Sequence, residues 1–145
     1  MSNLYDTDFY QWTQEQAALL QAGKASALDW ANLAEEIDSL GKNDRRGLGS
    51  HLQGLIMHLL KWQYQSSGRQ TGHSWLTSID NHRDDITDIV TDSPSLRRQI
   101  PTLIVQRYPR ARRKASRETG LPLEVFPVEC PWTAERVLDD DFLPE

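Results

Sequence analysis

The sequence predicts an all-α fold, a single compact bundle of about five helices over residues 1–145 with a proline-rich C-terminal extension from about residue 120. Two observations predict it. Apolar side chains recur every three or four residues through most of the first 119 positions, which is the period of a helix that packs on one face. Glycine and proline stand where those periodic runs would end or begin. A chain of this length can bury about two thirds of its extended surface, enough for one domain.

The first helix is expected from Asp6 to Ala22, with Gly23 as its stop. Asp8 is one candidate N-cap, because its carboxylate can accept hydrogen bonds from the free amides of a first turn. Thr13 with Gln16 three residues later is an alternative capping box, which would start the helix later. The element is predicted, and its start stays open between these two.

The segment from Asp29 to Tyr64 predicts two helices that form an antiparallel hairpin, turning at Gly41 to Asn43. Asp29 is the expected N-cap of the first helix, and Gly41 its expected end. The apolar stripe of the first helix is Trp30, Leu33, Ala34, Ile37 and Leu40. The stripe of the second is Leu48, Leu52, Leu55, Ile56, Leu59, Leu60 and Trp62. In such a hairpin Glu36 would lie level with residues 48–51, and Asp29 with residues 55–58.

An exposed Ser/Gly-rich loop is expected over Ser66 to Gly72, followed by a helix from about Ser74 to Thr91. His82 falls in the middle of the buried stripe of that helix, and Arg83 lies at its edge. An arginine beside a core needs an anionic partner, because an unpaired buried charge costs several kcal/mol. Glu36 is the first choice of partner, and Glu35 is the second.

The sequence Ser93-Pro94 is typical of a helix start, and the helix from Pro94 is expected to stop at Gly120. Pro101 and Pro109 lie inside it, so a kink or break is expected near each. Beyond Gly120, residues 133–138 predict one short closing helix.

The charge of the chain is distributed unevenly. The net charge is -5, yet residues 96–118 carry eight basic side chains and one acidic one, and residues 119–145 carry one basic and seven acidic ones. The only cysteine, Cys130, excludes a disulfide within the chain and a cysteine-based zinc site. The apolar runs are short and no secretory signal pattern is present. We therefore expect a cytoplasmic location and no membrane association.

The first candidate site is a polar cluster whose members flank the apolar stripes: Glu35, Glu36, His51, His58, His82 and Arg83. A carboxylate and an imidazole on facing helices can form a metal site or a general acid/base pair. Against this, His51 and His58 are two turns apart, about 10 Å along the axis, too far to share one ion directly. The alternative, which we favour, is a buried polar network that fixes the register of the helices, without metal or cofactor.

The second candidate site is a basic cluster made of Arg107, Arg110, Arg112, Arg113, Lys114 and Arg117. Such a cluster can face the phosphates of a nucleic acid. The acidic stretch from Glu135 to Glu145 could cover it instead, and an acidic partner protein could bind it. We expect nucleic-acid binding to be the weaker interpretation.

Several motifs occur together in one order: YDTDFYQWTQEQAALL, LDWANLAEEIDSLG, HLLKWQYQ, SW followed by IDNHR, DSPSLR, YPRARRKASRETGL, FPVECPWT and DDDFLPE. In these motifs the chain resembles the bacterial domain-of-unknown-function family number twenty-nine, from Tyr5 to Glu145. The resemblance implies a small all-helical protein and supplies no activity.

These patterns contain no complete catalytic constellation. We therefore expect a non-enzymatic protein-interaction module that binds an unknown protein partner or associates with itself. The alternatives are a hydrolase or metal-binding enzyme that uses the Glu/His/Arg cluster, and a nucleic-acid binder that uses the basic cluster.

Overall fold

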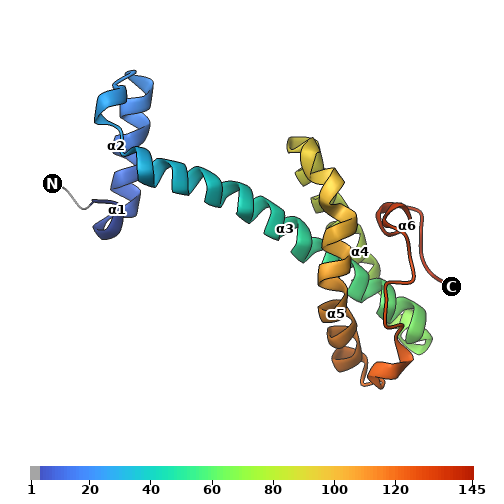
Figure 1. Ribbon diagram of the computed structural model, residues 1–145. Helices are drawn as coiled ribbons and strands as arrows, with labels where there is room; N and C mark the ends of the chain where they lie inside the picture. The colour runs from blue at the N-terminus through green and yellow to red at the C-terminus, as the bar shows by residue number, and fades with distance from the viewer. Residues whose placement is uncertain (1–3) are drawn as a thin grey trace. The chain divides into compact units, whose positions relative to one another are not determined.

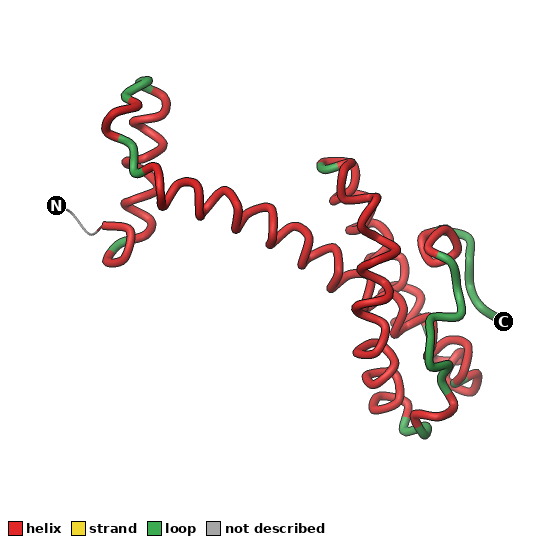
Figure 2. Tube along the Cα trace, in the orientation of Figure 1, coloured by secondary structure: helices red, strands yellow, loops and turns green. Residues whose placement is uncertain are grey.

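The computed structural model describes residues 4–145, apart from the side chains at positions 70 and 71. Within that range it has six α-helices, four 3-10 helices and no strand, so the predicted all-α class is confirmed (Figures 1 and 2). The chain divides into two compact units, Met1–Asn43 and Asp44–Glu145, and each is described by itself below. The prediction of one domain over 1–145 stays a prediction.

The predicted hairpin is wrong, because Trp30–Tyr64 is one helix, α3. Gly41 does not take the positive φ of a helix stop; in residues 4–145 only Gly23 and Gly120 do. Lys42 forms an ion pair with Asp38 one turn earlier, with 2.9 Å between Nζ and Oδ2, as expected for a helix that continues. A glycine in an exposed helix interior costs only about 1 kcal/mol, which does not by itself end a helix.

The N-terminal unit begins with two helices in place of one: α1, Leu4–Thr7, and α2, Phe9–Gln21. Asp8 separates them and caps α2, accepting from the backbone amide of Gln11 at 3.0 Å. The capping-box alternative is wrong, since the hydroxyl of Thr13 donates to the carbonyl of Tyr10. After α2 come Gly23 with φ +70° and a 3-10 turn, η1, Ala25–Ala27.

Trp12 anchors this unit. Its indole is buried, packs against the rings of Tyr5 and Phe9, and donates to the carboxylate of Asp29 at 3.0 Å. Buried Gln16 accepts from the backbone amide of Asp29 at 2.9 Å. These two side chains of α2 therefore hold the residue just before α3.

The apolar stripe predicted at the start of α3 is not buried. Trp30, Ile37 and Leu40 are 64%, 67% and 65% exposed. The hairpin partner that was expected to cover them does not exist, because that sequence is the continuation of α3 itself. The helical period predicted the helix correctly, but the apolar side chains that we expected to pack against a core are exposed.

The C-terminal unit has its core between three helices: the second half of α3, α4, His73–Asp92, and α5, Ile100–Thr119. The core side chains of α3 match the predicted second stripe except for Trp62, and all are completely buried: Leu48, Leu52, Leu55, Ile56, Leu59 and Leu60. Ile79, Ile86 and Val90 of α4 complete one side. Leu103, Ile104, Tyr108, Ala111 and Ala115 of α5 complete the other.

The predicted exposed loop is a 3-10 helix, η2, Ser66–Thr71, and Gly72 after it is buried. A Cβ at Gly72 would lie 3.0 Å from the carbonyl oxygen of Arg69, so this position has little room for a side chain. The predicted exposure is confirmed for Ser66 and Ser67, whereas Gly68 and Arg69 are partly buried. The helix that follows, α4, begins and ends one residue outside the predicted range.

The proline-containing segment starts with a 3-10 helix, η3, Pro94–Gln99, before α5. The expected break near Pro101 is present, since the 3-10 helix gives way to α5 at Ile100 and the proline occupies the first turn. Pro109 lies inside α5 without ending it. Gly120 ends α5 with φ +73°, the left-handed conformation predicted for this stop.

The C-terminal extension contains η4, Leu123–Val125, and α6, Ala134–Leu138, which Thr133 caps by accepting from the amide of Arg136. Most of the rest is irregular (Figure 2). Phe126 and Val137 are buried in the core, so the extension is part of this unit. Among the helices described, none is long and apolar enough to cross a membrane.

Candidate functional site

The structure brings the three histidines of the predicted polar cluster together. His51 and His58 lie on α3 and His82 on α4, and the ring of His82 is 5.3 Å from that of His51 and 6.1 Å from that of His58, between centroids. Gly54, one turn from His51 and His58 along α3, makes this possible. A Cβ at Gly54 would lie 2.5 Å from Nε2 of His82.

His51 and His82 share a hydrogen bond between their Nδ1 atoms, 3.1 Å apart. One of the two nitrogens must donate, so the rings hold opposite tautomers or a single shared proton. Asp85, one turn after His82 on α4, lies 3.6 Å from Nδ1 of His51. Burial lowers the pKa of His82, and nearby His51 lowers it further.

His58 is the innermost of the three. Burial, with smaller contributions from Lys61 and His82, lowers the pKa of His58 to about 4, so its ring is neutral near pH 7. Its Nδ1 is buried and has no hydrogen-bond partner among the residues that the structure describes. Lys61 is itself buried, with Nζ 3.8 Å from the carboxylate of Glu118 and 4.9 Å from the ring of Trp75.

The carboxylates expected in this cluster are elsewhere. The hydroxyl of Tyr5 donates to Glu36 within the N-terminal unit, which raises the pKa of Tyr5 to about 12. Glu35 is exposed on the same turn. Glu36 and His51 lie on the same continuous helix, α3. They do not lie on two facing helices, because the predicted hairpin does not form.

Arg83 is buried at 2% exposure, as its position beside the core indicated. Its expected partner, Glu36, was wrong. The guanidinium donates to two backbone carbonyl oxygens of the C-terminal extension, those of Val137 at 3.0 Å and Phe142 at 2.9 Å. Burial lowers the pKa of Arg83, while the negative charges of Asp140, Asp80 and Asp139 oppose that shift.

Arginine side chains hold the extension at further points. Arg112 of α5 donates to the carbonyls of Phe126 and Leu123, at 3.1 and 3.2 Å, and Arg69 donates to that of Pro144 at 3.5 Å. An irregular segment has few backbone partners of its own, so its buried carbonyls need other donors. The arginines of the helices supply them.

The hydrogen-bonded rings of His51 and His82 can pass a proton from one imidazole to the other. Within the residues described, no group of three histidine, cysteine, aspartate or glutamate side chains is placed to hold a metal ion. Of the polar network that the sequence suggested, only the three histidines lie together. Arg83 instead binds carbonyl oxygens of the extension, and Glu36 accepts a hydrogen bond from Tyr5.

The predicted basic cluster separates into two kinds of residue. Arg107 and Arg112 are half-buried and structural: Arg107 donates to the side-chain oxygen of Gln53 and the carbonyl of Arg46, and Gly49 leaves room for its guanidinium. The remaining four are exposed and make no hydrogen bond or ion pair within residues 4–145: Arg110, Arg113, Lys114 and Arg117. We call these four the basic face.

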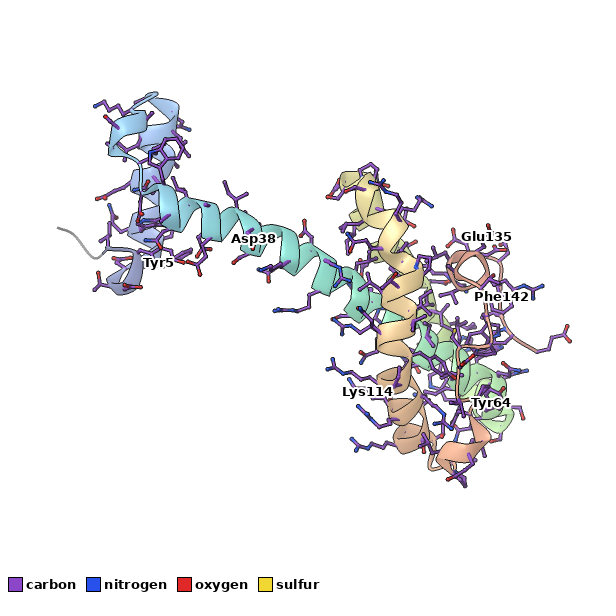
Figure 3. All side chains as sticks on the ribbon, viewed as in Figure 1. Tyr5, Asp38, Tyr64, Lys114, Glu135 and Phe142 are labelled. Carbon is purple, nitrogen blue, oxygen red and sulfur yellow. The ribbon has the colours of Figure 1, made fainter. Side chains whose placement is uncertain are left out.

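The acidic C-terminal stretch does not cover the basic face. No carboxylate of that stretch forms an ion pair with a residue of α5 in the described part of the chain. Figure 3 shows Lys114 on α5 well apart from Glu135 and Phe142 of the extension. The extension turns instead toward Arg83 and Arg69.

The sequence did not reveal an apolar groove between α5 and the extension. It has a volume of about 510 Å³ and is lined by Val105 and Pro109 of α5 and by Val128, Cys130 and Trp132 of the extension, among others. Cys130 donates to the carbonyl of Trp132 at 3.5 Å, and burial raises the pKa of its thiol, which makes it a poor nucleophile. The one available signal was Val105 and Pro109 themselves, apolar residues outside the buried stripe of α5.

The sequence matches a family model described as Domain of unknown function DUF29 over residues 4–143. No curated protein and no solved structure matches the chain.

Proposed function

The chain belongs to the family described as Domain of unknown function DUF29, and we propose that it is a cytoplasmic, non-enzymatic protein-interaction module whose basic face binds an acidic segment of a partner protein. One observation carries the proposal. All four cations of the basic face are exposed and without an ion pair in the described residues, although seven acidic side chains follow in the same unit after residue 119.

The spacing of the basic face is unfavourable in the isolated protein. Arg110 is three and four residues from Arg113 and Lys114, and Arg117 is four and three residues after the same two. Like charges at these separations on a helix repel each other by a few tenths of a kcal/mol per pair. A bound carboxylate-rich segment would relieve this repulsion, and Arg side chains can bind carboxylates with two parallel hydrogen bonds.

Two features favour a protein over a nucleic acid as the partner. The net charge of the chain is -5, so its overall field repels a long polyanion. The N-terminal unit exposes Trp30, Ile37 and Leu40 on one helix face, and exposed apolar patches of this kind mark protein interaction surfaces.

The test compares the wild type with the triple variant Arg110→Glu, Arg113→Glu, Arg117→Glu, in binding to immobilised poly-glutamate and to duplex DNA. Arg112 stays unchanged because it holds the extension. The control is Arg97→Glu with Arg98→Glu, which changes two exposed charges outside α5. We expect binding of wild type and control to poly-glutamate, weakening with salt, and at least a tenfold loss in the triple variant with an unchanged circular dichroism spectrum.

Equal binding by the triple variant and the wild type would reject the basic face. Binding to DNA alone, with a steep dependence on salt, would replace the proposal with the nucleic-acid alternative.

The competing proposal, a hydrolase or metal-binding enzyme, is favoured by one observation: the 3.1 Å contact between His51 and His82 with Asp85 beside it. Calorimetric titration with Zn²⁺ tests it. Heat of binding that disappears in the double variant His51→Ala, His82→Ala would support this alternative, and absence of binding in both proteins would remove its metal form.

A further inference from the structure

We infer that the apolar groove beside the basic face receives one bulky apolar side chain of the same acidic segment, so that the partner is recognised as an apolar anchor followed by carboxylates. This inference rests on the proposed function and names the chemistry of its partner. It is carried by the geometry of α5, along which the groove and the basic face are continuous.

The groove is open and apolar. Val105 on α5 and Val128 on the extension both line it, and they are 74% and 77% exposed. Its volume of about 510 Å³ lies within the range of sites that bury small ligands or anchor side chains. Two valines this exposed leave apolar surface in water, which an apolar occupant of the groove would remove.

Pro109 adds a polar feature to the wall. It has no N–H, so the carbonyl oxygen of Val105, four residues earlier, lacks its usual helical hydrogen bond. Both residues line the groove. A backbone N–H of an occupant in extended conformation could use this oxygen as an acceptor.

The groove leads into the basic face along a single row of side chains. Val105, Pro109, Arg113 and Arg117 are spaced four residues apart, and residues at this spacing form one ridge on a helix surface. Each step along the ridge rises about 6 Å. The first two members line the groove, and the last two belong to the basic face.

The ridge defines the order of groups in the occupant. A segment whose apolar side chain lies between Val105 and Pro109 would meet Arg113 about three extended residues later and Arg117 about two residues beyond that, at about 3.3 Å per residue. Glu129 lines the groove as well and would repel a carboxylate placed inside it. The carboxylates of the occupant therefore lie outside the groove, along the ridge toward Arg113 and Arg117.

The experiment measures fluorescence anisotropy with two labelled synthetic peptides. The first is a short run of glutamates, and the second is the same run preceded by one tryptophan. Burying a side chain of this size strengthens binding by about 10- to 100-fold, so we expect the anchored peptide to bind that much more tightly. The variant Val105→Asp should lose this gain and still bind the glutamate-only peptide.

The control variant is Val125→Asp, a valine of the same unit that is 40% exposed and is not among the residues that line the groove. It should keep the full gain. A gain that persists in Val105→Asp, or that is absent from the wild type, would overturn the inference while the proposed function survives on glutamate binding alone.

Failure of the proposed function looks different, because neither peptide would then bind the wild type. Self-association of the wild type that Val105→Asp abolishes would also overturn the inference, by showing that a second copy occupies the groove. Analytical ultracentrifugation of both proteins without peptide distinguishes this outcome.

Discussion

Replacing Arg83 by methionine should detach the C-terminal extension from α4. Methionine is unbranched and apolar, so it keeps much of the packing and removes the two hydrogen bonds to the carbonyls of Val137 and Phe142. A hydrogen bond to a charged group contributes about 1.5–3 kcal/mol, and a buried acceptor left without a donor costs a similar amount. We therefore expect Arg83→Met to lose about 3–5 kcal/mol of unfolding free energy.

That loss is a large part of the stability of a typical domain, about 5–15 kcal/mol. Urea unfolding followed by circular dichroism measures it, and the melting temperature should fall by at least about 10 °C. Hydrogen exchange adds a local measurement, since the amides of residues 134–142 should lose protection before those of the core helices. Arg83→Lys should restore part of the loss, because an ammonium group can donate to one carbonyl but lacks the fork of a guanidinium.

The control is Arg98→Met, an exposed arginine whose replacement should change the free energy of unfolding by less than about 0.5 kcal/mol. An Arg83→Met protein as stable as the wild type would refute the reasoning. It would mean that the cost of burying the guanidinium equals all that its hydrogen bonds contribute, a balance known for buried charges.

Further predictions concern α3 and the histidines. Gly41→Ala should raise the free energy of unfolding by about 0.5–1 kcal/mol in a denaturant titration, because the helix continues through this position; a loss would indicate the turn that the sequence suggested. Gly54→Ala should cost about 1–3 kcal/mol and separate His51 from His82, since its Cβ would lie 2.5 Å from Nε2 of His82, and NMR titration of the imidazole protons reads this out. Acidification should destabilise the protein through His58, whose pKa falls from an ordinary 6.5 to about 4 on folding. The unfolded chain then takes up the proton first, so this stability is complete above about pH 6.5 and is lost as the pH falls toward 4. The full shift corresponds to roughly 3 kcal/mol, and partial exposure of the ring reduces it to about 1–2 kcal/mol. His58→Gln should remove this part of the pH dependence, and an unchanged dependence would contradict the assignment.

For the candidate polar cluster, the sequence predicted which residues lie beside the core better than it predicted their contacts. His82 and Arg83 were placed beside a core from their position in the stripe of α4, and both are at least half-buried. The partners of Arg83 could not be read from the sequence, because they are backbone carbonyls 54 and 59 residues away, in a segment without a regular pattern. Every residue has a backbone carbonyl oxygen, so the residue type gives no signal of which ones accept from Arg83.

The basic cluster shows the same limit. Charge density along residues 107–117 was visible in the sequence, and it gave all six residues the same interpretation. Arg107 and Arg112 lie toward carbonyls and amides of neighbouring segments, whereas Arg113 lies toward water. Only the packing of α5 on α3, which gives Arg107 its partners, and the path of the extension, which gives Arg112 its partners, decide which arginines are structural.

The sequence by itself determined the helical class, the stops at Gly23 and Gly120 and the closing helix after Thr133, because each depends on a few adjacent residues and their backbone preferences. It left the cap of α2 open between Asp8 and Thr13, and the structure selects Asp8. The continuation of α3 through Gly41 is also a local matter, because the helical cost of one exposed glycine is about 1 kcal/mol and Lys42 pairs with Asp38 across the same turn. Tertiary structure alone decided where the extension lies, since its position depends on donors from distant helices that satisfy its carbonyls.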